Sequence, residues 1–171
     1  MDAVRLQKAV FVVLLLLAAA QVAYFYPKMP ATVASHFNES GKANGFMPRD
    51  GFVGIYFFVM ALMGVTFFLM PKGILKFPDS MVSLPHKRYW LAPGRRAKTG
   101  EMIEAYMNEC GNATLVFLLL VFQMSFTANL DGTQTLPERM WYYLAIFMLY
   151  MAAWTIRFIR SFKLPPGEKE P

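Results

Sequence analysis

Two histidines and one cysteine are the side chains best suited to metal binding or to proton transfer near neutral pH. His36 lies near Glu39 and Asp50 in the sequence, so a metal ligand or a pH-responsive group is one interpretation. However, a metal site needs three or four converging ligands, and a lone Cys110 excludes both an internal disulfide and a cysteine cluster. We therefore expect His36 to be a packed or turn-bonding residue. We expect no catalytic residue, no metal and no cofactor, so the chain is not predicted to be an enzyme.

A second dense segment, Leu84–Arg96, combines basic and aromatic side chains. Its candidate binding residues are Lys87, Arg88, Tyr89, Trp90, Arg95 and Arg96. Basic residues beside a bilayer attract anionic headgroups by about 1 kcal/mol each, and Tyr and Trp favour headgroup depth. We interpret the segment as a lipid-binding loop. A binding site for a cytoplasmic protein is the alternative.

Four apolar runs must position the segment around His36 and the segment Leu84–Arg96. They are Ala9–Tyr26, Phe52–Met70, Cys110–Leu130 and Met140–Ile156, with the last helix expected to end near residue 158. A helix needs about 20 apolar residues to cross roughly 30 Å of hydrocarbon. The sequence thus predicts an all-α integral membrane protein, a four-transmembrane-helix bundle with a compact outer loop and a basic cytoplasmic loop. One domain should cover residues 1–163, and residues 164–171 should be a disordered tail.

The basic residues are distributed unevenly between the two sides of this predicted bundle. Thirteen Lys and Arg residues fall at the N-terminus, in the second loop and in the C-terminal tail, whereas the first and third loops hold four. The positive-inside rule then places both termini in the cytoplasm. The net charge of +6 does not indicate nucleic acid binding, because the basic residues flank apolar spans.

The first apolar run has an alternative interpretation as a cleaved signal peptide. Arg5 and Lys8 precede it, and Gln21-Val22-Ala23 loosely resembles a cleavage site. The run continues to Tyr26, which is long for a signal peptide, so we expect a retained membrane helix.

The outer loop after Pro27 and Pro30 should be a compact extended segment with turns. Asn44-Gly45 is a tight-turn signal, and Gly41 or Gly45 is expected to have a positive φ.

Helix ends and polar positions give further expectations. Asp50 should cap the second span, and Thr135 with Glu138 matches a capping box for the fourth. From Glu101, an amphipathic helix should lie in the interface or under the bundle before the third span. Gln123 and Ser125 should form hydrogen bonds between helices.

Two motifs resemble a known family. The first runs from Pro30 to Phe46 and contains His36-Phe37-Asn38, Gly41 and Asn44-Gly45, and the second is Leu84–Arg96. Together they resemble the bacterial membrane family catalogued as domain of unknown function 1648. That family includes immunity proteins against the sporulation-delaying bacteriocin, which also sequester a repressor at the membrane. The resemblance implies a bacterial inner membrane and an ordered outer loop.

This chain departs from the family pattern in three respects. Asn44 stands where many members have aspartate, His86 stands where asparagine is usual, and the additional C-terminal spans of the immunity proteins are not expected here.

Two functional hypotheses follow. In the first, the protein senses, or confers immunity to, an envelope-acting peptide. The ligand would contact His36, Phe37, Asn38, Asn44 and Gly45. The basic inner loop would hold anionic lipid or a protein partner. In the second, the protein is a structural or accessory subunit of a membrane complex without a signalling role.

Overall fold

The computed structural model describes residues 3–168 and contains four long helices, α1 (Ala3–Phe25), α2 (Arg49–Met63), α4 (Arg96–Leu130) and α5 (Arg139–Ser161). Helix α2 continues as a π-helix over Gly64–Leu69. All four helices are long and apolar enough to cross a membrane, over Val4–Lys28, Arg49–Leu69, Arg96–Leu130 and Arg139–Ser161. The prediction of four helices that are long and apolar enough to span a membrane is confirmed.

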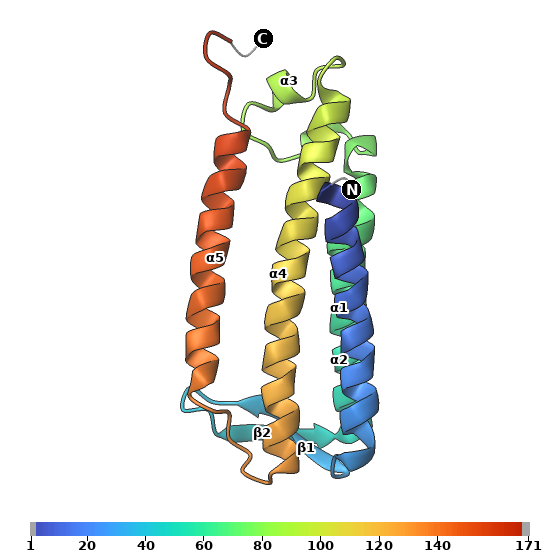
Figure 1. Ribbon diagram of the computed structural model, residues 1–171, viewed down its shortest axis with the longest axis vertical. Helices are drawn as coiled ribbons and strands as arrows, with labels where there is room; N and C mark the ends of the chain where they lie inside the picture. Colours follow the sequence, from blue (N-terminus) through green and yellow to red (C-terminus); the bar gives the residue numbers. More distant parts are fainter. Residues whose placement is uncertain (1–2, 169–171) are drawn as a thin grey trace.

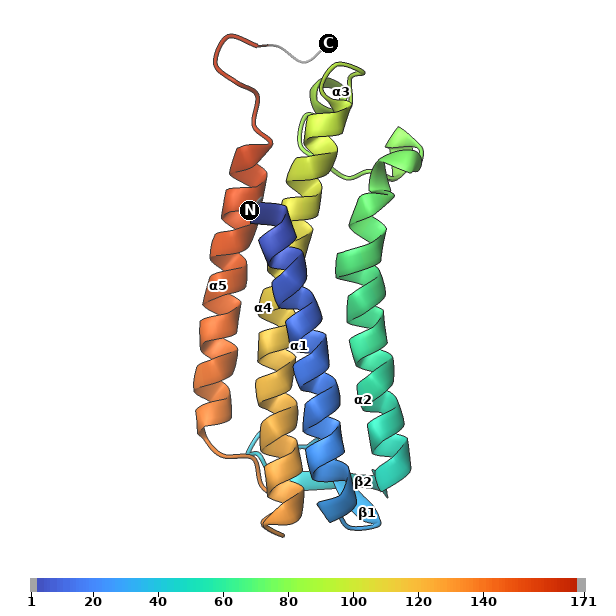
Figure 2. The ribbon, with the colours of Figure 1, turned by 45° about the vertical axis from the view of Figure 1, so that its right-hand side comes forward.

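The helices run alternately up and down, with α1 and α4 in the middle and with α2 and α5 flanking them (Figures 1 and 2). The start of α1, the end of α5 and the segment between α2 and α4 gather at one end of the bundle. We call this the basic end. A small β-hairpin covers the opposite end.

The core lies between α1, α2 and α4 and is rich in aromatic side chains. Phe25 stacks on Phe126 with ring centroids 5.0 Å apart, and Tyr56 meets Phe122 edge-on at 4.6 Å. Such pairs add about 0.5–1.5 kcal/mol each beyond their area burial. Gly111 lets the helices approach closely, because a Cβ there would lie 2.5 Å from the Cβ of Phe67. The three helices thus form one interlocked unit.

Helix α5 packs more loosely than the other three. None of its residues is buried, although Phe117 of α4 and Phe147 of α5 stack at 4.4 Å and Trp154 Nε1 donates to the Tyr106 carbonyl. Helix α5 thus runs antiparallel to α4 and is attached to the bundle along it.

The outer loop forms strands β1 (Thr32–Phe37) and β2 (Ala43–Pro48), paired antiparallel. The all-α expectation is wrong for this segment. Strand pairing satisfies backbone groups that a merely extended loop would leave without partners.

The position of the hairpin turn also differs from the expectation. The chain turns at 38–42, where Asn38 Oδ1 accepts from the backbone N–H of Ser40 and Lys42 and Gly41 has φ +78°. The positive φ of Gly41 is confirmed. The tight turn predicted at Asn44-Gly45 is wrong, because both residues lie inside β2.

Helix α4 begins earlier than expected and is not interrupted. At 35 residues it is about 52 Å long, more than the hydrocarbon core requires. The amphipathic segment from Glu101 is therefore the first part of α4 itself and not a separate helix before it. The prolines of the preceding loop permit only short helices, of which α3 (Lys87–Trp90) is one.

Neither predicted helix cap forms. The carboxylate of Asp50 accepts from the Tyr26 hydroxyl at 2.9 Å, and α2 has no side-chain cap. Thr135 Oγ1 donates to the Thr133 carbonyl instead of to α5. Thr135 is bridged to Lys42, and α5 begins only at Arg139, so Thr135 does not stand at the N-cap of this helix. Of the predicted tail, residues 164–168 include a turn, and residues 169–171 lie outside the described chain.

Candidate functional sites

His36 and Asn44 face each other across the hairpin on its exposed side. Their Nδ1 and Oδ1 atoms are 2.5 Å apart. Gly45 pairs with His36 in the strand register, and a Cβ on Gly45 would lie 2.9 Å from the His36 Cβ. The glycine thus gives the imidazole room to reach Asn44.

We call the exposed side of the sheet the outer hairpin face. Its residues are Thr32, His36, Asn44, Phe46 and Pro48. Phe46 is 51% exposed, which is notable for an aromatic side chain on a strand. Of the predicted ligand-binding residues, His36, Asn38 and Asn44 are exposed, whereas Phe37 and Gly45 are half-buried. Asn38 builds the turn.

A buried amide holds the hairpin to the bundle. Asn129, at the end of α4, accepts from the Ala34 N–H at 2.6 Å and donates to the Ala34 carbonyl at 3.0 Å. One side chain therefore makes both hydrogen bonds that a neighbouring strand would make. Asn129 is not among the candidate site residues identified from the sequence. Its place one residue before the end of an apolar run is the signal that could have found it.

The loop between α4 and α5 provides a second attachment. The Ala43 N–H donates to the Gln134 carbonyl, and the Leu136 N–H donates to the Gly41 carbonyl, both at 2.8 Å. Backbone bonds therefore join the hairpin turn to the loop before α5. The outer hairpin face is consequently presented on a fixed support.

A polar network crosses the bundle beneath the hairpin. The Tyr56 hydroxyl donates to Gln21 Oε1, and Gln21 Nε2 donates to Gln123 Oε1, each at 2.9 Å. The interpretation of Gln123 as an interhelical hydrogen-bonding residue is confirmed. The Ser125 carbonyl accepts from Asn129 within α4 itself, so this bond does not join two helices as was expected of Ser125.

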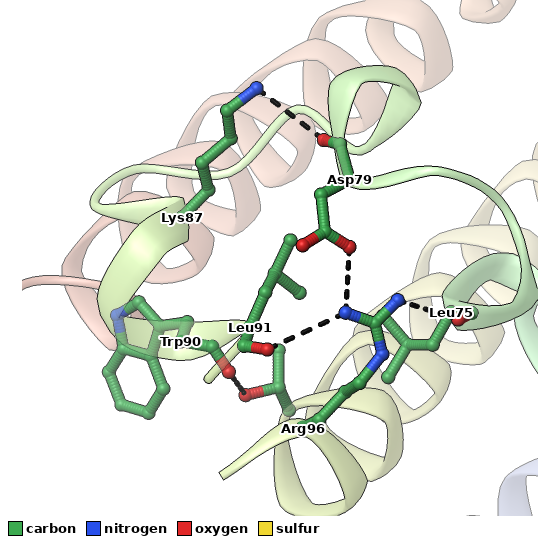
Figure 3. Close-up of polar contacts among 7 residues, drawn as sticks. Leu75, Asp79, Lys87, Trp90, Leu91 and Arg96 are labelled. Carbon is green, nitrogen blue, oxygen red and sulfur yellow. Dashed lines mark hydrogen bonds and ion pairs between the residues drawn. The ribbon is translucent and has the colours of Figure 1, made fainter. Parts of the chain in front are cut away.

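At the basic end, Arg96 organises the inner loop, as Figure 3 shows. Its guanidinium donates to Asp79 Oδ1 at 2.7 Å and to the Leu75 carbonyl at 2.8 Å. Thr99 Oγ1 donates to the Trp90 carbonyl at 2.8 Å. The start of α4 thereby fixes both halves of the loop.

The aromatic residues of the loop point into the protein. Tyr89 is only 5% exposed, and the Arg95 guanidinium lies 3.7 Å over its ring. Trp90 Nε1 donates to the carbonyl of the buried Phe162, just past α5. Of the six predicted lipid- or partner-binding residues, Arg88 is fully exposed, and Lys87 donates to the Asp79 carbonyl at 3.4 Å. The other four help to fold the loop.

The described residues hold no group of three or more His, Cys, Asp or Glu side chains that could bind a metal ion.

No curated protein and no solved structure matches this chain. A family model does match residues 13–63, which run from α1 through the hairpin into α2. The matched segment includes the first of the two motifs, with His36, Asn44 and Gly45. The described family is "Domain of unknown function (DUF1648)", and the resemblance to it is confirmed over residues 13–63.

Proposed function

We propose that this protein is a bacterial inner-membrane sensor or immunity protein that recognises an envelope-acting peptide with its outer hairpin face. In this proposal both termini and the basic end lie in the cytoplasm. The unequal distribution of Lys and Arg supports that orientation, since the segments rich in these two residues gather at the basic end.

The observation that carries the proposal is the combination of a fixed backbone with outward-facing side chains. Asn129 and the loop before α5 hold the hairpin through backbone groups, so the side chains of the outer face are not needed to keep it folded. Preorganised groups bind a ligand with less loss of conformational freedom. Phe46 adds an exposed apolar side chain on the same strand as Asn44.

The chemistry of the outer face suits a peptide backbone. With Asn44 Oδ1 as acceptor, the proton of His36 lies on Nδ1, so Nε2 is an acceptor and Asn44 Nδ2 a donor. A peptide group offers the complementary N–H and C=O. Phe46 adds an apolar contact for a side chain of the ligand.

The test is complementation of a deletion strain challenged with a panel of envelope-acting peptides. The wild-type protein should restore resistance or the transcriptional response. His36→Ala with Asn44→Ala should abolish it at unchanged membrane abundance, and Phe46→Ser should weaken it. Lys42→Ala, in the turn beside the strands, is the matched control and should behave as the wild type.

The accessory-subunit hypothesis draws on a different observation, the thin packing of α5. An apolar helix attached by one face could also contact a partner helix. Purification in mild detergent separates the two proposals. If the deletion strain responds normally to every peptide, but a membrane complex dissociates, the accessory role replaces the sensor role.

A further inference from the structure

A cavity of about 430 Å³ lies between α4 and α5 and reaches the start of α1. Its walls are apolar along the bundle, with Val116, Phe117, Leu120, Ile146 and Phe147, whereas Gln7, Glu109 and Asn112 lie at the end nearer the termini. The volume is within the usual range for small-molecule sites. The cavity is thus apolar along most of its length and polar at one end, as a binding site for an amphiphile would be.

A second cavity of about 260 Å³ continues toward the basic end. It is lined by Gln7, Ala105, Tyr106, Glu109 and Arg157, so the two cavities share Gln7 and Glu109. The shared residues lie directly before the apolar runs that begin at Ala9 and Cys110. This is the depth at which lipid headgroups meet acyl chains.

Two amide oxygens at this junction have no hydrogen-bond donor. Gln7 Oε1 and Asn112 Oδ1 are buried without a partner among the described residues, although Asn112 Nδ2 donates to the Gln7 carbonyl at 3.0 Å. Buried polar atoms are almost always paired, so two such acceptors on residues that line the same cavity indicate a missing donor. The terminal torsion of a glutamine is soft, which lets Oε1 turn toward the shared space.

Opposite charges stand beside these oxygens. Glu109 accepts from the Tyr150 hydroxyl at 2.6 Å and pairs with Arg157, whose side chain is 53% exposed. A ligand headgroup that carries both a hydrogen-bond-donating cation and an anion would therefore meet an opposite charge for each.

We propose that the joined cavities bind one phospholipid with a primary ammonium headgroup, taken from the leaflet on the side of the termini. The ammonium donates to Glu109 and Gln7 Oε1, and the phosphate accepts from Arg157. One acyl chain lies along Val116 and Phe147. This site is separate from the outer hairpin face and does not depend on the function proposed for it.

Native mass spectrometry of the purified full chain, with phosphatidylethanolamine and phosphatidylcholine of identical acyl chains, tests the proposal. Phosphatidylcholine is the matched probe because its quaternary ammonium has no N–H. We expect one phosphatidylethanolamine to remain bound with an affinity roughly tenfold higher, as charge-assisted hydrogen bonds would give. Equal retention of both lipids overturns the proposal. Stronger retention of anionic phosphatidylglycerol also overturns it, and assigns lipid binding to the basic loop.

Variants locate the site. Ala113→Trp fills the apolar cavity and should remove the bound lipid. Leu149 is 72% exposed on α5 and does not line the cavity, so Leu149→Trp should not remove it. Gln7→Leu keeps the backbone carbonyl used by Asn112 and should reduce the preference for phosphatidylethanolamine roughly threefold to tenfold. If Gln7→Leu folds and retains the full preference, the head is not recognised there and the proposal fails.

Discussion

The two ends of the bundle are held together in opposite ways. At the hairpin end, backbone groups and one buried amide make the attachments, so the exposed side chains of the strands remain available. At the basic end, Arg95, Arg96 and Trp90 make the attachments themselves. Candidate binding residues of the second motif are thus structural at the basic end. Candidate binding residues of the first motif, such as His36 and Asn44, are presented to solvent at the hairpin end.

The largest expected effect concerns which end faces outward. Reporter fusions after Lys42 and after Thr133 should be exported, and fusions after Lys87 and after Lys169 should be cytoplasmic, because the basic residues gather at one end. Paired phosphatase and fluorescent-protein fusions measure this. An exported signal at Lys87 would reverse the assignment of both ends.

The second prediction concerns a variant that removes the attachment of the hairpin to α4. Asn129→Ala deletes three buried hydrogen bonds, two with Ala34 and one to the Ser125 carbonyl, and leaves both polar groups of Ala34 without this partner. We therefore expect a loss of about 2–4 kcal/mol of stability. Thermal unfolding in detergent and protease cleavage within residues 31–48 report it. Asn129→Asp keeps the acceptor and should lie between alanine and wild type. If Asn44→Ala, which touches only the outer face, destabilises as much, the contrast between the two ends is lost.

The third prediction concerns the space that Gly45 leaves for His36. Gly45→Val places a Cβ only 2.9 Å from the His36 Cβ and should lower the yield of folded protein in detergent. Lys42→Ala alters an exposed side chain in the same loop and should leave the yield unchanged. Equal yields for the two variants would show that the strand pairing tolerates an added side chain.

The smallest effect is expected at the basic end. Arg96→Gln removes a charged bond to Asp79 and should increase protease cleavage within residues 73–95, with a cost of about 1–2 kcal/mol. Arg88→Gln, which changes an exposed residue of the same loop, should leave cleavage unchanged and reduce only the binding of anionic vesicles. If Arg88→Gln increases cleavage equally, the loop is held by total charge and not by specific bonds.

Sequence reasoning predicted the spans well because hydrophobic length is a local property. It failed at the hairpin, where Asn44-Gly45 obeys the strand register with His36 and not its local turn preference. It also failed at Thr135 and Glu138, whose capping box is replaced by pairing with Lys42. Each failure occurs where a partner far along the chain overrides a local signal.

The candidate site shows the same limit. His36 and Asn44 were identified from a motif, and the structure brings them together. Phe46 and Asn129 were not identified from the sequence, since neither exposure on a strand nor a contact with Ala34 is visible there. Tyr89 and Trp90 have the composition of interfacial anchors, yet their contacts with Arg95 and Phe162 turn them inward.

The bond between Ala34 and Asn129 also constrains how the protein is made. The two residues are 95 positions apart, so the hairpin leaves the ribosome long before its attachment point exists. Until the third membrane helix has been synthesised and inserted, the N–H and C=O of Ala34 have no such partner. The outer hairpin face is therefore completed late in biogenesis, and a nascent chain that stalls before residue 129 would carry a hairpin without its anchor.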